Sequence, residues 1–303
     1  MRNKMKYINF MGTKISKLSL GTVQFGLEYG IANEDGKLTQ KNVNKIIDYV
    51  VQNGINCFDT APLYGNSEEV LGKALSPDCE KYIISKISSS LFKNSAKSSV
   101  ENSLKNLNIN SLFALLLHDS TQLYDWNTED SKVVETLIKE KKIKYFGVSI
   151  YSTDDFDLAI KNDKISFIQI PFNLFDQRAY KEKWFEKAKK NNKLIFIRSV
   201  YLQGLLLMDQ NNLPDNLKKA KKYLEILNLY ADKLSLTRNQ LALSFVDSIA
   251  KDSLILFGCD TLAQAKENID SYNTLKTVDD LTIKQLSIDL KDIDESIYNP
   301  TKW

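Results

Sequence analysis

The chain has 303 residues, of which 43% are hydrophobic, so it is long and apolar enough to bury a sizeable core. Its formal net charge is +3, and basic and acidic residues are mixed along its length. This balance argues against a surface dedicated to nucleic acid or to a membrane. The lysine-rich stretches at 139–144 and 218–222 are typical of solvated helix faces. With no linker or low-complexity segment in view, we expect residues 1–303 to form a single domain.

Three cysteines, Cys57, Cys79 and Cys259, are scattered along the chain without the spacing of a disulfide framework or a metal site. This pattern fits a reducing compartment. The N-terminus, MRNKMKYINF, is basic but lacks a following apolar core and a small-residue cleavage site. No apolar run approaches the ~18 residues that a membrane span needs. We therefore expect a soluble, cytoplasmic protein that holds no metal.

Two strands at residues 6–10 and 14–19 are the first elements predicted, and they form a hairpin. The motif GTVQFG follows, and its glycines, Gly21 and Gly26, favour a tight, exposed loop. Beyond it, apolar runs alternate with segments of helical periodicity. The predicted strands are 18–20, 55–58, 81–85, 112–117, 145–148, 167–170, 194–197 and 253–257. The predicted helices are 41–53, 67–75, 95–107, 131–140, 154–161, 181–191 and 238–249.

About eight strands, each followed by helical sequence, are what a closed (β/α)8 barrel needs. A doubly wound open sheet also alternates, but no GxGxxG motif follows an early strand here. The strands are short, continuous apolar runs, as expected for a sheet covered on both faces. We therefore predict a TIM barrel with an N-terminal β-hairpin. Extra helices are predicted around 218–230 and, in the C-terminal tail, near 283–290.

Four polar side chains close three successive strand-like runs. Asp59 ends the run of CFDTAPLYG and Tyr64 lies in its loop, while Lys86 and His118 end the next two runs. Taken singly, each has an ordinary structural explanation: a capping carboxylate, a loop aromatic, a solvated rim lysine and a hydrogen-bonded histidine. Barrel active sites, however, collect at the carboxyl ends of the strands. Their joint position therefore favours catalysis.

The same residues resemble the catalytic tetrad of the aldo-keto reductases, through the motifs FDTAPLYG, ISK and LLLHD in this order. The resemblance continues through GVS, QIPFN and FGCDTLAQAKEN, and so covers roughly residues 18 to 270. It implies that Asp59 pairs with Lys86, whose charge lowers the pKa of Tyr64 from its usual value of about 10. Tyr64 would then give its proton to a carbonyl oxygen as hydride arrives from the cofactor, and His118 would orient that oxygen.

The resemblance also implies a set of cofactor-binding residues on the loops that follow the strands. Beside the cofactor in the first loop, it places Gly21, Thr22 and Gln24. Near the nicotinamide carboxamide it places Ser149, Gln169 and Asn173. Beneath the pyrophosphate it places Ser199, Leu202 and Gly204. At the adenosine end it places Gly258, Gln264, Glu267 and Asn268. The amides at 169 and 173 also have a simpler interpretation as hydrogen-bonded rim residues.

Two departures from the family bear on the cofactor. Arg198 stands where many relatives have an aromatic ring against the nicotinamide, and a guanidinium can either stack or meet an anion. Gln264 stands where some relatives have arginine, and Asp260 would repel a 2′-phosphate if it points inward. Lys266 is expected to face solvent. Family habit favours NADPH over NADH, but with a preference of only about ten- to thirtyfold, or ~1–2 kcal/mol.

The predicted function is reduction of an aldehyde or ketone to an alcohol with NAD(P)H, and the partner is a small carbonyl compound. The wording of the first loop, LGTVQFG and IANEDG, also resembles reductases of bacterial surface-polysaccharide pathways. That likeness suggests a sugar or nucleotide-sugar carbonyl. The alternative is a cofactor-sensing regulatory or binding subunit on a reductase fold, which an intact tetrad disfavours.

Overall fold

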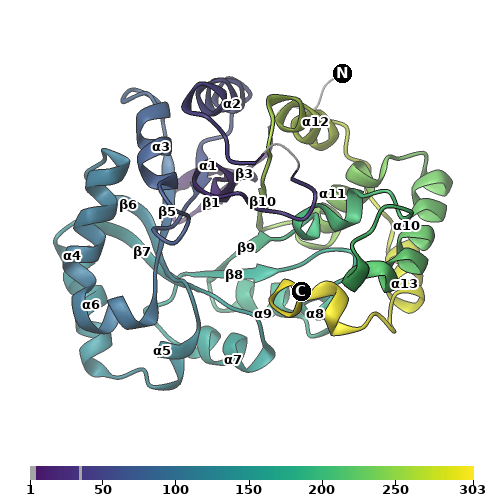
Figure 1. Cartoon of the computed structure of the whole chain (residues 1–303). Coiled ribbons are helices and arrows are strands. Elements are labelled where there is room, and N and C mark those ends of the chain that lie inside the picture. The colour runs from purple at the N-terminus through teal and green to yellow at the C-terminus, as the bar shows by residue number, and fades with distance from the viewer. Residues whose placement is uncertain (1–4, 34–35) are drawn as a thin grey trace.

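Eight parallel strands closed into a barrel form the centre of the computed structural model, which describes residues 5–33 and 36–303 (Figure 1). Around the barrel, each strand pairs with its neighbours in the order β10-β3-β4-β5-β6-β7-β8-β9. This confirms the predicted (β/α)8 fold. The barrel strands are β3 (Leu18–Gly21), β4 (Cys57–Asp59), β5 (Tyr82–Ile87), β6 (Leu112–Leu117), β7 (Ile143–Ser149), β8 (Phe167–Pro171), β9 (Leu194–Arg198) and β10 (Leu254–Phe257).

Helices surround the barrel, and their ends follow sequence signals. Thr39 caps α2 by accepting from the Asn42 amide, and Thr237 forms a capping box with Gln240 at the start of α11. The α-helices are α1 (Val23–Gly26), α2 (Gln40–Gln52), α3 (Ser67–Ala74), α4 (Ser89–Leu107), α5 (Thr121–Tyr124), α6 (Thr128–Lys139), α7 (Thr153–Lys161), α8 (Arg178–Lys181), α9 (Trp184–Lys190), α10 (Lys221–Leu234), α11 (Arg238–Ile249), α12 (Leu262–Asn273), α13 (Asp280–Asp289) and α14 (Glu295–Tyr298). Three 3-10 segments are η1 (Leu202–Leu207), η2 (Asp215–Ala220) and η3 (Pro300–Lys302).

The structure bears out the extra helices, because α10 follows the long segment after β9 and α13 lies in the tail. The predicted start of one helix was wrong. Helix α4 begins at Ser89, where the Ser88 side chain caps it, and a kink at Ser95 separates its two halves. The sequence analysis detected only the second half, because the first is rich in polar residues. Among the described residues, no helix is long and apolar enough to cross a membrane.

The GTVQFG segment is not an exposed loop, because its middle forms the buried turn of helix α1. Gly26 lies against the loop that carries Tyr64. A Cβ atom on Gly26 would come within 1.6 Å of the Tyr64 carbonyl oxygen. The glycine is therefore needed for close backbone contact, which fixes the height of the tyrosine loop above the barrel.

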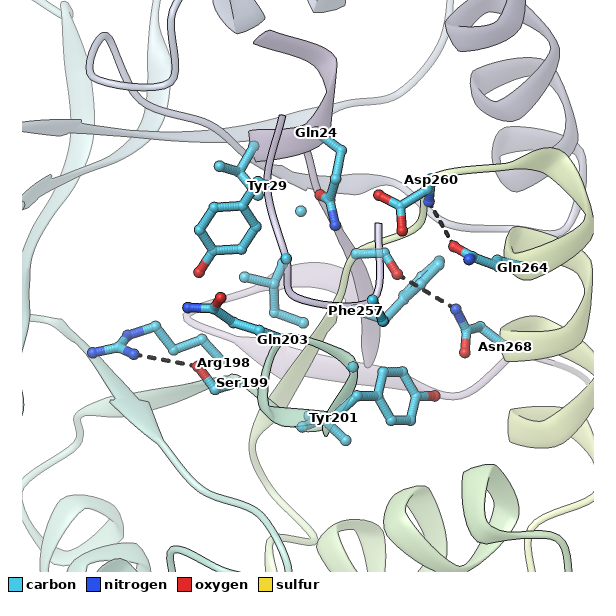
Figure 2. A pocket seen from close by; sticks show the side chains of 18 of the residues that line it. Gln24, Tyr29, Arg198, Ser199, Tyr201, Gln203, Phe257, Asp260, Gln264 and Asn268 are labelled. Carbon is cyan, nitrogen blue, oxygen red and sulfur yellow. Dashed lines mark hydrogen bonds between the residues drawn. The ribbon is translucent and has the colours of Figure 1, made fainter. Parts of the chain in front are cut away.

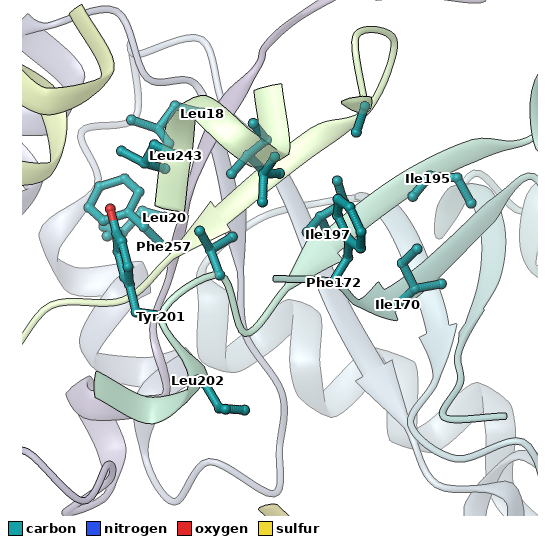
Figure 3. Close-up of a cluster of buried hydrophobic side chains, with 14 of the residues drawn as sticks. Leu18, Leu20, Ile170, Phe172, Ile195, Ile197, Tyr201, Leu202, Leu243 and Phe257 are labelled. Carbon is teal, nitrogen blue, oxygen red and sulfur yellow. The ribbon is translucent and has the colours of Figure 1, made fainter. Parts of the chain in front are cut away.

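Hydrophobic side chains fill both sides of the sheet. Outside the strands, Leu18 and Leu20 lie beside Leu243 of α11 and Tyr201, as Figure 3 shows. At the amino ends of the strands, the hairpin of β1 (Tyr7–Phe10) and β2 (Thr13–Ser16) joins a second cluster. The Phe10 ring meets the rings of Tyr145 and Phe167 edge to face, with centroids 5.3 and 5.2 Å apart. The hairpin thus closes the bottom of the barrel and leaves the other end for the site.

Ile15 tests this role of the hairpin, since its side chain is fully buried in that cluster. Ile15→Ala should lower the free energy of unfolding by about 2–5 kcal/mol, and Ile15→Val by only ~0.5–1.5 kcal/mol. Urea unfolding followed by circular dichroism measures both values. Equal stability of the alanine variant and the wild type would show that the hairpin does not contribute to the core.

Candidate active site

Every barrel strand delivers a polar or small residue to its carboxyl end, around one cavity of about 760 Å³. That volume is within the range of small-molecule sites. Figure 2 shows part of its lining, with Arg198 at one end and Asn268 at the other. The strand-end residues that line it, from β3 round to β10, are Gly21, Asp59, Lys86, His118, Ser149, Gln169, Arg198 and Gly258.

Lys86 links the predicted tetrad. Its ammonium donates to Asp59 Oδ2 at 2.6 Å and is 3.1 Å from the Tyr64 hydroxyl oxygen. It also donates to the Thr60 carbonyl oxygen at 3.1 Å. The Lys86 and Asp59 side chains are only 1% and 3% exposed, whereas Tyr64 reaches into the cavity. The structure therefore brings these residues together in the geometry that the sequence predicts.

A second set of contacts holds Asp59 in place. Its other carboxylate oxygen accepts from Gln169 Nε2 at 2.9 Å, across the barrel from β8. Its carbonyl oxygen accepts from both the amide and the hydroxyl of Thr22, at 3.0 and 2.9 Å. The Ser67 hydroxyl joins Thr22 to Thr60, at 2.8 and 3.1 Å. Of two residues predicted as cofactor ligands, Gln169 thus holds the Asp59 carboxylate that orients Lys86, and Thr22 holds the Asp59 main chain.

Burial and charge act in opposite directions on the two proton-carrying groups. Burial lowers the pKa of Lys86, but Asp59 and Tyr64 outweigh it, so the net pKa is raised and the ammonium is retained. Burial raises the pKa of Tyr64, and Lys86 offsets only part of that rise. Lys86 therefore lowers the pKa of Tyr64 in the predicted direction, but burial keeps the net pKa above its ordinary value. At neutral pH the phenol holds its proton, as a general acid must.

His118 faces the tyrosine from the end of β6. The two rings meet edge to face with centroids 5.6 Å apart. Burial, followed by the charges of Lys86 and Arg198, lowers the pKa of His118 to about 4. Its Nδ1 atom has no hydrogen-bond partner among the residues that the structure describes. His118 is thus a neutral imidazole that can orient a substrate oxygen without carrying charge.

Arg198 is held at the cavity wall by three contacts. Its guanidinium lies 4.1 Å from the centre of the Tyr151 ring, and it donates to the Ile150 carbonyl oxygen at 3.2 Å. It also donates to Ser199 Oγ at 3.3 Å (Figure 2). Its charge reaches both Tyr64 and His118, whose pKa values it lowers. A cation therefore lies beside the predicted tetrad, at the position where the family resemblance places an aromatic ring in many relatives.

The structure gathers most of the predicted cofactor residues around the cavity but not all of them. Asn173 and Leu202 are buried outside the lining. Asn173 instead donates to the Ser199 carbonyl oxygen at 3.0 Å and thereby supports the loop after β9. In that loop, Ser199, Leu202, Gln203 and Gly204 have positive φ angles. The predicted residues that do line the cavity are Gly21, Thr22, Gln24, Ser149, Gln169, Arg198, Ser199, Gly204, Gly258, Gln264, Glu267 and Asn268.

The far end of the cavity is built from the start of α12. Gln264 turns its side-chain oxygen back onto the Asp260 amide at 2.6 Å (Figure 2). Asp260 lines the cavity, as the sequence analysis allowed. Lys266 points elsewhere, with its ammonium 5.6 Å from the centre of the Tyr49 ring on α2. Lys266 is therefore not a cation for this end of the site.

The lining includes further residues that the sequence analysis did not assign to the site, and four that bring polar groups are Tyr29, Tyr151, Gln203 and Arg238. Three of them lie in loops after strands, where no periodicity marks which side chain turns inward. The fourth begins helix α11. Burial and the neighbouring Tyr64 raise the pKa of Tyr29 to about 12, so this second phenol is neutral. The sequence did contain one signal for Tyr29 as a site residue, because it places a tyrosine in the loop that follows the first barrel strand.

Comparisons with known proteins identify the class of protein to which this barrel and its site belong. The sequence model of the Aldo/keto reductase family matches residues 17–287. Over 295 residues the chain is 25% identical to the uncharacterized oxidoreductase YqkF of Bacillus subtilis. The aligned residues make up 88% of this chain and 90% of YqkF.

Two solved structures share the fold. The aldo-keto reductase AKR11C1 from Bacillus halodurans, in its holo form, has a TM-score of 0.77 at 20% identity and covers 99% of this chain and 100% of its own. An aldo-keto reductase from Klebsiella pneumoniae in complex with NADPH has a TM-score of 0.70 at 20% identity, over 95% of each chain. The chain therefore belongs to the aldo/keto reductase family and is an oxidoreductase.

The single histidine makes the charge state of His118 directly measurable. A proton NMR titration should show its ring resonance unchanged from pH 8 to 5 and shifting only near pH 4. Because the unfolded histidine takes up a proton near pH 6.5 and the folded one does not, this group should make the fold less stable as pH falls between those values. A midpoint near 6.5 would show that the imidazole is neither desolvated nor near Lys86.

Proposed function

We propose that the protein reduces an aldehyde or ketone to an alcohol with NAD(P)H. The observation that carries this proposal is the contact of Lys86 with both Asp59 and Tyr64 at the mouth of the barrel. A carbonyl oxygen within reach of the Tyr64 hydroxyl would receive its proton, and His118 would orient that oxygen. As negative charge moves onto Tyr64, the fixed ammonium of Lys86 stabilises it. NAD(P)H, when bound, supplies the hydride.

Two glycines shape the wall of the cavity in which the cofactor would bind. Gly258 lies at a close approach, since a Cβ there would come 2.6 Å from Gln24 Nε2. Gly204, with φ of +96°, would place a Cβ 2.6 Å from Ala32. These glycines thus allow Gln24 and Ala32 to approach the neighbouring backbone closely at the wall of the cavity. Relatives in the family have been solved with NADP and NADPH, which supports the same cofactor here.

A polar substrate suits the part of the cavity around the tetrad. Tyr29, Tyr151, Gln203 and Arg198 bring phenols, an amide and a guanidinium to this end. Such groups hydrogen-bond hydroxyl groups and reject purely apolar carbonyls. We therefore propose a hydroxylated carbonyl, of which a sugar or nucleotide-sugar is the leading case. A panel of aldoses, nucleotide-sugars and simple aldehydes, followed by NAD(P)H absorbance, tests this choice.

The same panel separates an enzyme from a cofactor-sensing subunit. An enzyme turns over with at least one carbonyl compound of the panel, whereas a sensor binds NAD(P)H without consuming it. The tetrad favours turnover, because a sensor does not need a phenol in contact with a buried ammonium.

Tyr64→Phe removes the proposed proton donor and little else. Turnover of a good substrate should fall by about 10²- to 10⁴-fold, the usual contribution of a general acid. Cofactor binding, measured by fluorescence titration, should stay close to the wild-type value. Tyr29→Phe is the matched control, because it removes a phenol from the same cavity but not from Lys86, and its loss should be smaller. Wild-type turnover in Tyr64→Phe would exclude Tyr64 as the acid.

A further inference from the structure

Arg238 lies in the cavity without a role in the tetrad. It is the first residue of α11, directly after the capping Thr237, and both residues line the cavity. The next residue, Asn239, donates to Asn268 of α12 at 3.1 Å and accepts from the Tyr201 hydroxyl at 3.0 Å. Arg238 therefore belongs to the end of the cavity where α11, α12 and the loop after β9 meet, away from Tyr64.

The hydrogen-bonding capacity of this guanidinium is mostly unused. Nη2 donates to the Leu207 carbonyl oxygen at 3.1 Å. Nη1 is buried and has no hydrogen-bond partner among the residues that the structure describes. Burial lowers the pKa of Arg238, and the charge of Asp209 only partly compensates. A buried donor on a cation is costly to leave unsatisfied, so the site is built for an acceptor that it does not itself contain.

The charges at this end single out Arg238. Asp260 and Glu267 line the same region and are acidic. The other cations that line the cavity within the described chain, Lys86 and Arg198, lie at the tetrad end and already have partners there. Lys266 faces the Tyr49 ring. An anionic ligand that extends from the tetrad to α12 therefore meets one cation at its far end.

We propose that Arg238 binds a phosphate group of the dinucleotide cofactor, an inference that rests on the proposed function. A guanidinium matches phosphate oxygens in a two-pronged contact, and phosphate is the anionic part of NAD(P)H. The cofactor offers two anionic groups: the pyrophosphate, which NADH and NADPH share, and the 2′-phosphate, which only NADPH carries. Leu207 positions the guanidinium, because it fixes Nη2 and leaves Nη1 for the ligand.

The test is a fluorescence titration of the purified full chain with NADPH and with NADH, for the wild type, Arg238→Gln and Arg238→Lys. Lys266→Gln is the matched control, since it removes a cation on α12 that faces away from the cavity. Thermal unfolding of each variant confirms that it folds. Arg238→Gln should weaken NADPH binding by about ten- to a hundredfold, Arg238→Lys should restore part of it, and Lys266→Gln should change little.

The pattern of the losses identifies the phosphate. Equal losses for the two cofactors assign Arg238 to the pyrophosphate, and a loss confined to NADPH assigns it to the 2′-phosphate. Wild-type affinity for both cofactors in folded Arg238→Gln would overturn the inference while leaving the proposed function standing. Failure of the wild type to bind either cofactor would instead contradict the proposed function itself.

Discussion

The buried ion pair between Lys86 and Asp59 is the interaction on which the site depends. Two charges removed from water are costly unless their geometry is good and their remaining hydrogen-bonding positions are satisfied. Here Gln169 donates to the second carboxylate oxygen of Asp59. The Lys86 ammonium also donates to the Thr60 carbonyl oxygen and to the Tyr64 hydroxyl oxygen. The closed barrel makes this possible, because parallel strands far apart in the sequence end beside one another. Through its ammonium, Lys86 also contacts the hydroxyl of Tyr64, which lines the cavity.

The electrostatics of the site keep Tyr64 protonated, while Lys86 makes its proton easier to release. Burial alone would keep the Tyr64 proton too tightly bound, and Lys86 reduces that effect without removing it. His118 stays neutral for the same reason, since burial and two neighbouring cations disfavour its charged form. The tetrad therefore presents one cation, one protonated phenol and one neutral imidazole to the cavity. Each of these states is set by its neighbours rather than by the ordinary pKa of the group.

The sequence predicted the barrel and the position of the four polar residues at its mouth because both follow from local patterns. Apolar runs mark the strands, and the residue that ends each run must lie at the mouth of a parallel barrel, as Lys86 does. Arg238 could not be found this way, because a helix start carries no sign of which side chain turns inward. The net rise of the Tyr64 pKa could not be predicted for a related reason. The sequence names the charged neighbour that lowers this pKa, but the burial that raises it depends on how α1 and its Gly26 pack against the loop. The first half of α4 was hidden by its serines, which favour caps and turns in isolation.

Lys86 lowers the pKa of Tyr64 against the effect of burial. NMR of protein labelled at the tyrosine ¹³Cζ positions measures this without any substrate, and the Tyr64 signal is assigned by its loss in Tyr64→Phe. In Lys86→Met the Tyr64 signal should titrate at higher pH than in the wild type, because the ammonium is gone while Asp59 remains. An equal or lower titration point in a folded Lys86→Met protein would contradict the account.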